Sequence, residues 1–175
     1  MENMIDLETF IRDVPDFPKP GILFKDITPL LADPAALSEA CSRLAGPYEG
    51  KGVTRVVGIE SRGFLFGVPV AERLGAGFVP VRKPGKLPAK TVSQTYELEY
   101  GTDEVQIHAD AISPGQKVVL IDDLLATGGT MAAACELVNK LGAQIVGVGF
   151  VIELCFLPGR QKLTGYDVQS LIQVN

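Results

Sequence analysis

Strand, loop and helix signals follow one another in the segment Lys117-Val-Val-Leu-Ile-Asp-Asp-Leu-Leu-Ala-Thr-Gly-Gly-Thr130. Residues 118–121 form a short, uninterrupted run of β-branched and aliphatic side chains, which is typical of a strand buried on both faces of a parallel sheet. Asp122 and Asp123 follow where that strand would emerge at its carboxyl end. The next segment, 131–141, has apolar residues at helical spacing and predicts a helix.

Small residues make up the loop between the predicted strand and helix: Ala126, Thr127, Gly128, Gly129 and Thr130. Their amides can approach an anion closely, and the free N–H groups and macrodipole of a helix N-terminus favour a phosphate. The two preceding carboxylates would repel a bare polyphosphate but can accept hydrogen bonds from the vicinal hydroxyls of a ribose. The segment therefore predicts a site for a ribose 5-phosphate. No Lys follows the glycines and no Gly-x-Gly-x-x-Gly occurs, so the usual nucleotide fingerprints are missing.

Composition limits the class of protein. The chain has 175 residues with 46% hydrophobic content, enough for one domain with a continuous core. Lys and Arg total 16 against 21 Asp and Glu, and the net charge of −5 argues against nucleic acid or an anionic membrane as the main partner. No apolar stretch approaches the roughly 20 residues that span a bilayer. The acidic N-terminus does not resemble a signal peptide.

The cysteines and the histidine carry no obvious site. Cys41, Cys135 and Cys155 are widely separated and odd in number, so they fit neither a disulfide framework nor a zinc pattern. We expect them to be buried free thiols in a reducing cytoplasm. A hydrolase triad would have to rely on His108, the single histidine, which has no cysteine or serine motif around it.

Strand and helix patterns alternate along the chain, which predicts right-handed crossovers and an α/β fold with a central parallel sheet flanked by helices. The expected extended segments are 22–27, 55–59, 78–82, 118–121, 144–154 and 168–174. The expected helices are 5–14, 34–45, 64–74 and 131–141, and 91–100 with 103–108 form a hairpin. Ligands of such sheets lie beyond the carboxyl ends of the strands, where the loops after Ile59, Val81 and Ile121 begin.

Two of these loops carry cations suited to a pyrophosphate. Ser61 and Arg62 stand at a strand-to-helix junction, where backbone amides supply direction and the guanidinium supplies charge. Arg82, Lys83 and Lys86 surround a Pro-Gly turn; alone they are equally compatible with a solvated loop. Residues 23–25 (Leu23, Phe24 and Lys25) follow a prolyl turn. Phe24 could stack on a purine while the backbone reads its edge, although residue chemistry alone favours a core role.

Ile121–Thr130 resembles the phosphoribosyl-pyrophosphate (PRPP) motif of the type I phosphoribosyltransferases. Phe24-Lys25-Asp26-Ile27 after Pro-Gly, together with Tyr96-Glu97-Leu98-Glu99-Tyr100-Gly101, resembles the adenine phosphoribosyltransferase family. Many members of that family have Arg at the position of Lys25. If the backbone makes the contact there, the substitution matters little.

The resemblance implies a single domain over 1–175 with a small N-terminal hood (1–33), a core (34–175) and a flexible β-hairpin lid (about 86–108). It also implies conversion of adenine and PRPP to AMP and pyrophosphate in a cytoplasmic homodimer. A cis peptide is expected at Glu60-Ser61 or Ser61-Arg62. The loop after Val81 would act within one subunit or reach into its neighbour.

The same resemblance implies a catalytic role for Glu99, Tyr100 and Arg62. Glu99 would contact the purine or manage a ring proton, and Tyr100 would shield the reacting carbon from water. Mg²⁺ is expected as cofactor, held mainly by the substrate and not by a protein cage. The rival readings are the same chemistry on a 6-oxo purine, xanthine or orotate, and a PRPP-sensing regulator that binds nucleic acid.

Overall fold

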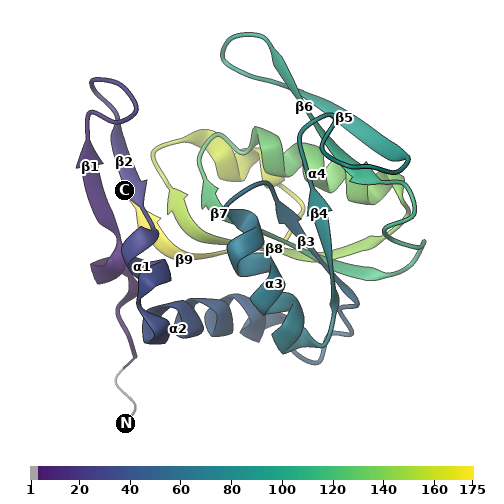
Figure 1. Ribbon diagram of the computed structural model, residues 1–175, viewed down its shortest axis with the longest axis horizontal. Coiled ribbons are helices and arrows are strands. Elements are labelled where there is room, and N and C mark those ends of the chain that lie inside the picture. Colours follow the sequence, from purple (N-terminus) through teal and green to yellow (C-terminus); the bar gives the residue numbers. More distant parts are fainter. Residues whose placement is uncertain (1–3) are drawn as a thin grey trace.

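A five-stranded parallel sheet with the strand order β4-β3-β7-β8-β9 forms the centre of the computed structural model, which describes residues 4–175 (Figure 1). Every neighbouring pair in this sheet is parallel. The strands are β3 (Arg55–Ile59), β4 (Gly77–Val81), β7 (Lys117–Leu125), β8 (Gln144–Leu154) and β9 (Val168–Val174). The predicted parallel α/β architecture is confirmed.

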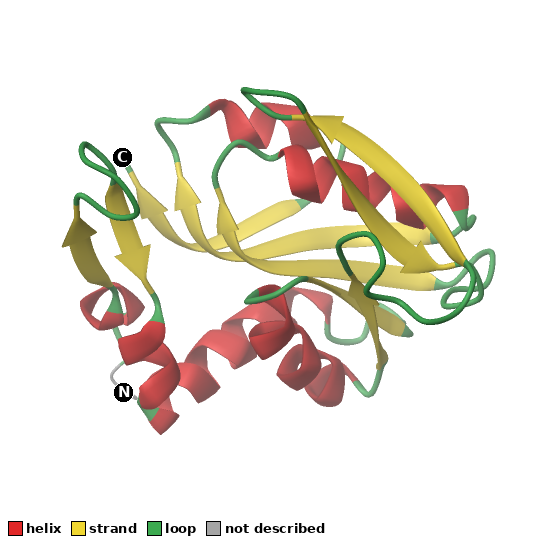
Figure 2. Ribbon diagram, turned by 45° about the horizontal axis from the view of Figure 1, so that its top comes forward, coloured by secondary structure: helices red, strands yellow, loops and turns green. Residues whose placement is uncertain are grey.

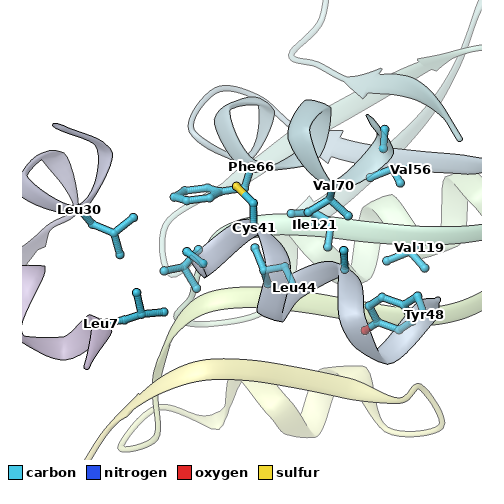
Figure 3. Close-up of a cluster of buried hydrophobic side chains, with 14 of the residues drawn as sticks. Leu7, Leu30, Cys41, Leu44, Tyr48, Val56, Phe66, Val70, Val119 and Ile121 are labelled. Carbon is cyan, nitrogen blue, oxygen red and sulfur yellow. The ribbon is translucent and has the colours of Figure 1, made fainter. Parts of the chain in front are cut away.

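Helices cover both faces of this sheet (Figure 2). On one face lie α2 (Pro34–Ala45) and α3 (Gly63–Leu74); on the other lie α4 (Gly129–Lys140) and the 3-10 helix η3 (Pro158–Leu163). Val119 and Ile121 of β7 belong to the first core, which Figure 3 shows around Leu44 and Phe66. The intervening residues of β7 pack into the second core with α4. This alternation leaves β7 buried on both faces, as a central parallel strand requires.

The carboxyl end of β7 extends further than the sequence predicted. The expected strand ended at Ile121, but the ladder with β8 continues through Asp122↔Phe150 to Leu125↔Glu153. The longer strand β8 supplies backbone partners for these added residues. Asp122 and Asp123 therefore lie within the strand, and Leu124 and Leu125 separate them from the small-residue loop.

Local capping signals predicted the core helices correctly. Asp33 precedes α2, and its carboxylate accepts hydrogen bonds from the amides of Ala35 and Ala36 at 3.0 and 2.8 Å. Gly75 ends α3 with φ of +62°, a left-handed conformation that glycine adopts without strain. A short 3-10 turn, η2 (Gly46–Tyr48), continues from α2.

The helix predicted over residues 5–14 is wrong. That segment forms a short 3-10 helix, η1 (Leu7–Phe10), and a strand, β1 (Arg12–Pro15), antiparallel to β2 (Leu23–Asp26). Ion pairs join the two strands at 2.7 Å (Arg12–Asp26) and 2.6 Å (Lys25–Asp13). Pairing with the next strand, β2, thus overrides the helical spacing. A five-residue helix that we did not predict, α1 (Thr28–Ala32), links this sheet to α2. Residues 1–3 of the expected hood lie outside the described range.

A second two-stranded sheet, β5 (Thr91–Glu97) with β6 (Thr102–His108), forms the expected hairpin on the α4 side of the molecule. Val105 and Ile107 are buried in the same core as α4, so the base of the hairpin is anchored. Among residues 4–175, no helix is long and apolar enough to cross a membrane. Cys41 and Cys135 are buried free thiols as expected, but Cys155 is exposed, contrary to the prediction.

Candidate active site

The small-residue loop, 126–130, lies between the carboxyl end of β7 and the first turn of α4; we call it the phosphate loop. Gly128 precedes α4 with φ of +79°. In the first backbone hydrogen bond of that helix, the amide of Ala132 donates to the carbonyl of Gly128. The amides before Ala132 therefore have no partner inside α4 and are available to an anion. The loop borders a small pocket of about 90 Å³. The predicted combination of loop and helix start is present.

The acidic pair lies beside this loop and is tightly packed. Asp123 is buried, and the Arg62 guanidinium binds its carboxylate at 2.8 Å. Asp122 accepts a hydrogen bond from the amide of Asp123 at 2.8 Å. Burial, followed by the charge of Asp123, raises the pKa of Asp122 well above its usual value. A Cβ at Gly63 would lie 2.9 Å from the Asp122 carboxylate, so only glycine lets α3 start this close to the acid.

The hood brings Phe24 to the same place. The guanidinium carbon of Arg62 lies 5.5 Å from the centre of the Phe24 ring, and Phe17 packs edge-on against that ring with a centroid distance of 5.1 Å. Arg62 therefore contacts the predicted base segment and the predicted ribose acid at once. Leu23 is exposed beside Phe24, while Lys25 turns away to pair with Asp13. The structure thus joins two segments nearly 100 positions apart in the sequence.

Two of the other predicted cations, Arg82 and Lys83, have partners within the chain. Arg82 binds the Glu60 carboxylate at 3.1 and 3.2 Å, and the amide of Lys83 donates to the same group at 3.0 Å. Hydrogen bonding from Arg82 lowers the pKa of Glu60. The Lys83 ammonium binds Asp103 of β6, and Lys86 is exposed. The cis peptide is Glu60-Ser61, one of the two expected bonds, and Ser61 is exposed beside Arg62.

The two predicted lid residues are not at the base segment in this structure. Glu99 and Tyr100 occupy the tip of the β5–β6 hairpin, where both are exposed and Tyr100 is 87% accessible. The hairpin tip projects from the molecule (Figure 1). The structure therefore assembles the phosphate loop, the acids, Arg62 and Phe24, and leaves the tip open.

Comparison with known proteins agrees with this geometry. A family model described as "Phosphoribosyl transferase domain" matches residues 25–166. Adenine phosphoribosyltransferase of Halothermothrix orenii is 58% identical over 169 residues, which are 97% of this chain and 99% of that protein. The chain belongs to the adenine phosphoribosyltransferase family. Its members are pentosyl transferases that make AMP from adenine and PRPP in purine salvage.

Solved structures of the family extend the agreement to the whole fold. The enzyme from Thermoanaerobacter pseudethanolicus is 55% identical, with a TM-score of 0.94, 98% of this chain covered and 100% of that chain. The Giardia lamblia enzyme, complexed with 9-deazaadenine, is 38% identical, with a TM-score of 0.91 and coverage of 100% and 99%. The Saccharomyces cerevisiae enzyme, complexed with adenine and an imino-altritol bisphosphate, is 43% identical, with a TM-score of 0.89 and coverage of 95% and 96%.

One element of this adenine phosphoribosyltransferase site escaped the sequence analysis. Gly159 in η3 lies directly behind the phosphate loop: a Cβ there would lie 2.2 Å from the Ala126 carbonyl oxygen, and one on Gly128 would lie 2.5 Å from that of Gly159. A Pro-Gly pair such as Pro158-Gly159 is typical of a turn, but nothing in the sequence indicates which residues that turn contacts. Gly159 lets two backbone segments meet with no side chain between them.

An ion pair between the exposed Arg160 and the buried Glu153 holds η3 in that position. Arg160 binds the Glu153 carboxylate at 2.8 and 2.5 Å, and the Ser170 hydroxyl donates to it at 2.6 Å. Glu153 is only 4% exposed, and hydrogen bonding from Arg160 lowers its pKa. Glu153 pairs with Leu125 in the sheet, immediately before the phosphate loop. The phosphate loop is therefore supported by β8, which pairs with the end of β7, and by η3, which packs against the loop backbone.

Proposed function

We propose that this chain transfers the 5-phosphoribosyl group of PRPP to adenine, giving AMP and pyrophosphate. The observation that carries the proposal is a chain of contacts: Phe24 packs on Arg62, and Arg62 binds Asp123. Asp123 lies near the end of β7, three positions before the phosphate loop. A base segment, a ribose acid and a phosphate site are thereby joined in one place. The adenine and 9-deazaadenine complexes of the two relatives support the choice of base.

The sugar phosphate would be held at two points. The amides of residues 126–130 and the hydroxyls of Thr127 and Thr130 would bind the 5-phosphate. Asp122 and Asp123 would hold the ribose hydroxyls, and the negative charge of Asp123 would favour an oxocarbenium-like transition state at the anomeric carbon. Arg62 would then release Asp123 and turn toward the pyrophosphate, which offers a stronger anionic partner.

The base would be read by the hood. Strand β2 pairs with β1 along one edge, and its other edge has no strand partner within residues 4–175. The backbone N–H and C=O groups of Leu23 and Lys25 can therefore meet the exocyclic amine and a ring nitrogen of adenine, while Phe24 stacks on the ring. A 6-oxo purine presents the opposite donor–acceptor pattern and would leave these groups unpaired.

The leaving group and the lid complete the proposed mechanism. Arg62, Arg82, Lys83 and Lys86 would stabilise the departing pyrophosphate. Closure of the hairpin tip would bring Glu99 and Tyr100 over the reacting carbon and exclude the water that would otherwise hydrolyse PRPP. The exposed tip and the anchored base of the hairpin support this motion.

Magnesium is proposed as the cofactor, because the family uses it with PRPP. The donor chemistry fits a hard cation, since Asp122 and Asp123 offer carboxylate oxygens beside the phosphate loop. Among residues 4–175, no group of three or more His, Cys, Asp or Glu side chains is placed to hold a metal ion. We therefore propose that the substrate supplies most ligands. When bound, the ion would offset the charge of the pyrophosphate.

The assembly and the compartment are also proposals. The side chains of Leu65 and Val68, in α3, are 47% and 51% exposed, and we propose that a second copy of the chain covers them in a homodimer. Light scattering tests the dimer.

The compartment is a separate proposal. Free thiols at Cys41 and Cys135 suit the reducing cytoplasm we propose. The division into hood, core and lid as one domain likewise stays a proposal. Dimers that combine one wild-type subunit with one subunit altered in the loop after Val81 would test whether this loop acts on its own site or on the site of the partner subunit. The measurement is the activity of each mixed dimer.

An endpoint assay tests the activity. The protein is mixed with PRPP, Mg²⁺ and equal amounts of adenine, hypoxanthine, guanine, xanthine and orotate, and the nucleotide product is identified. AMP alone supports the base site around Phe24. A different nucleotide would keep the phosphate loop and discard that base site. PRPP binding with no product, together with a PRPP-sensitive gel shift of DNA, would point to a regulator.

A further inference from the structure

The hydroxyl of Tyr96 is a junction between three parts of the site. It accepts a hydrogen bond from the Thr130 hydroxyl of the phosphate loop at 3.1 Å and from the Lys83 ammonium at 3.0 Å. It donates its own proton to the Asp103 carboxylate at 3.1 Å. A phenol has one proton and two lone pairs, so all its hydrogen-bonding capacity is used. One side chain thus connects the phosphate loop, the loop after Val81 and the hairpin.

Packing fixes the position of this hydroxyl. The Tyr96 ring lies against the start of α4, where a Cβ at Gly129 would come within 3.2 Å of it. The Lys83 ammonium lies 5.5 Å from the ring centre. Burial opposes the charge of Lys83, but its bonds to Asp103 and Tyr96 outweigh this and raise its pKa. Tyr96 is therefore clamped between a helix start and an ion pair.

We propose that Tyr96 is a positioning residue for the 5-phosphate: it orients the Thr130 hydroxyl and ties the lid, close to its tip, to the phosphate loop. The inference rests on the proposed phosphate site and adds a residue from outside that loop to it. Tyr96 stands 34 positions before Thr130 in the chain and belongs to the hairpin, not to the PRPP motif.

The hydrogen bonds can reverse without moving a heavy atom. Phosphate oxygens only accept, so the Thr130 hydroxyl must turn its proton from Tyr96 to the ligand. Tyr96 can then turn its proton from Asp103 to the Thr130 oxygen, and Asp103 keeps its ion pair with Lys83. Every proton keeps an acceptor throughout. A phenylalanine at position 96 would fill the same space but leave Thr130 without this support.

The test compares Tyr96→Phe with wild type in two binding titrations, one with ribose 5-phosphate and one with pyrophosphate, and in steady-state kinetics. Loss of one supporting hydrogen bond should weaken ribose 5-phosphate binding about 3- to 10-fold and raise KM for PRPP in parallel. Pyrophosphate affinity and KM for adenine should stay within about twofold, since Lys83 keeps its ion pair with Asp103 and Phe24 keeps its contacts. Tyr166→Phe is the matched control, because Tyr166 accepts one bond from Asn139 at the far end of α4.

A double-mutant cycle separates the inference from the phosphate site itself. Thr130→Val should weaken ribose 5-phosphate binding, and adding Tyr96→Phe should then have little further effect, because Tyr96 acts through Thr130. If Thr130→Val weakens binding but Tyr96→Phe does not, the role of Tyr96 is overturned and the site stands. If neither change matters, the phosphate site is wrong. If Tyr96→Phe and Tyr166→Phe weaken ribose 5-phosphate binding equally, the effect reflects a general loss of stability, and the role of Tyr96 is also overturned.

Discussion

Gly159→Ala offers the sharpest test of how η3 supports the phosphate loop. The added Cβ would lie 2.2 Å from the Ala126 carbonyl oxygen and 3.0 Å from a methyl group of Leu125. Carbon and oxygen normally approach no closer than about 3.3 Å, so the backbone of the loop must retreat by about 1 Å. The obstacle is backbone and cannot rotate away as a side chain would. The substitution therefore acts on the loop directly.

Two effects of different size follow from that displacement. Overpacking of this kind destabilises a protein by about 1–3 kcal/mol, which for a chain of this length lowers Tm by very roughly 2–10 °C. Displacing a substrate-positioning group by about 1 Å lowers activity by roughly 100-fold. We therefore expect a folded enzyme with a modestly lower Tm and a large loss of kcat/KM for PRPP.

Gly46→Ala is the matched control. Gly46 caps α2 with φ of −47°, and a Cβ there meets no atom within 4 Å. Alanine at such a position stabilises by about 0.4–1 kcal/mol and should leave activity unchanged. Thermal unfolding and initial-rate kinetics on both variants decide the matter. If Gly159→Ala keeps the kcat/KM of wild type, the proposed support of the phosphate loop by η3 is refuted. If, in addition, its Tm is lower than that of Gly46→Ala, Gly159 contributes to packing only.

Three further variants probe other parts of the site. Arg160→Met leaves the buried Glu153 carboxylate without its main partner and should lower the unfolding free energy by about 2–3 kcal/mol at pH 7 in urea denaturation. Because the pKa of Glu153 is lowered in the folded protein, the ion pair contributes its full stability above the unfolded pKa of about 4.5 and loses it as pH falls through the folded pKa. The unfolding free energies of wild type and variant should therefore converge in acid. A difference that stays constant with pH would contradict a stabilising role for the ion pair. Phe24→Leu should raise KM for adenine about 5- to 100-fold with KM for PRPP unchanged, because one base stack is removed; equal changes in both would place Phe24 in the core only. Glu99→Gln should lower kcat about 10²- to 10⁴-fold if the lid carboxylate handles a ring proton, and an unchanged kcat across pH 6–9 would dismiss it.

Much of the fold could be predicted because its signals are local. The uninterrupted apolar run of β7, the Asp33 cap before α2 and the Gly75 stop after α3 each depend on residues within a few positions of one another. The phosphate loop could be predicted for the same reason, because the loop and the start of the following helix are contiguous in the sequence. Where helical spacing competed with strand pairing, the prediction failed, as at β1, which pairs with β2 across a seven-residue loop.

The sequence by itself predicted which residues could hold a phosphate and a ribose, and its resemblance to a known family added the base segment. Only the tertiary structure decided which of them meet. Arg62 bridges Asp123 and Phe24, Gly159 backs the phosphate loop, and Tyr96 reaches Thr130. These contacts join distant segments, and their positions depend on how strands and helices pack around the common core. A local pattern cannot encode them, because side-chain period and capping specify an element but not its neighbour.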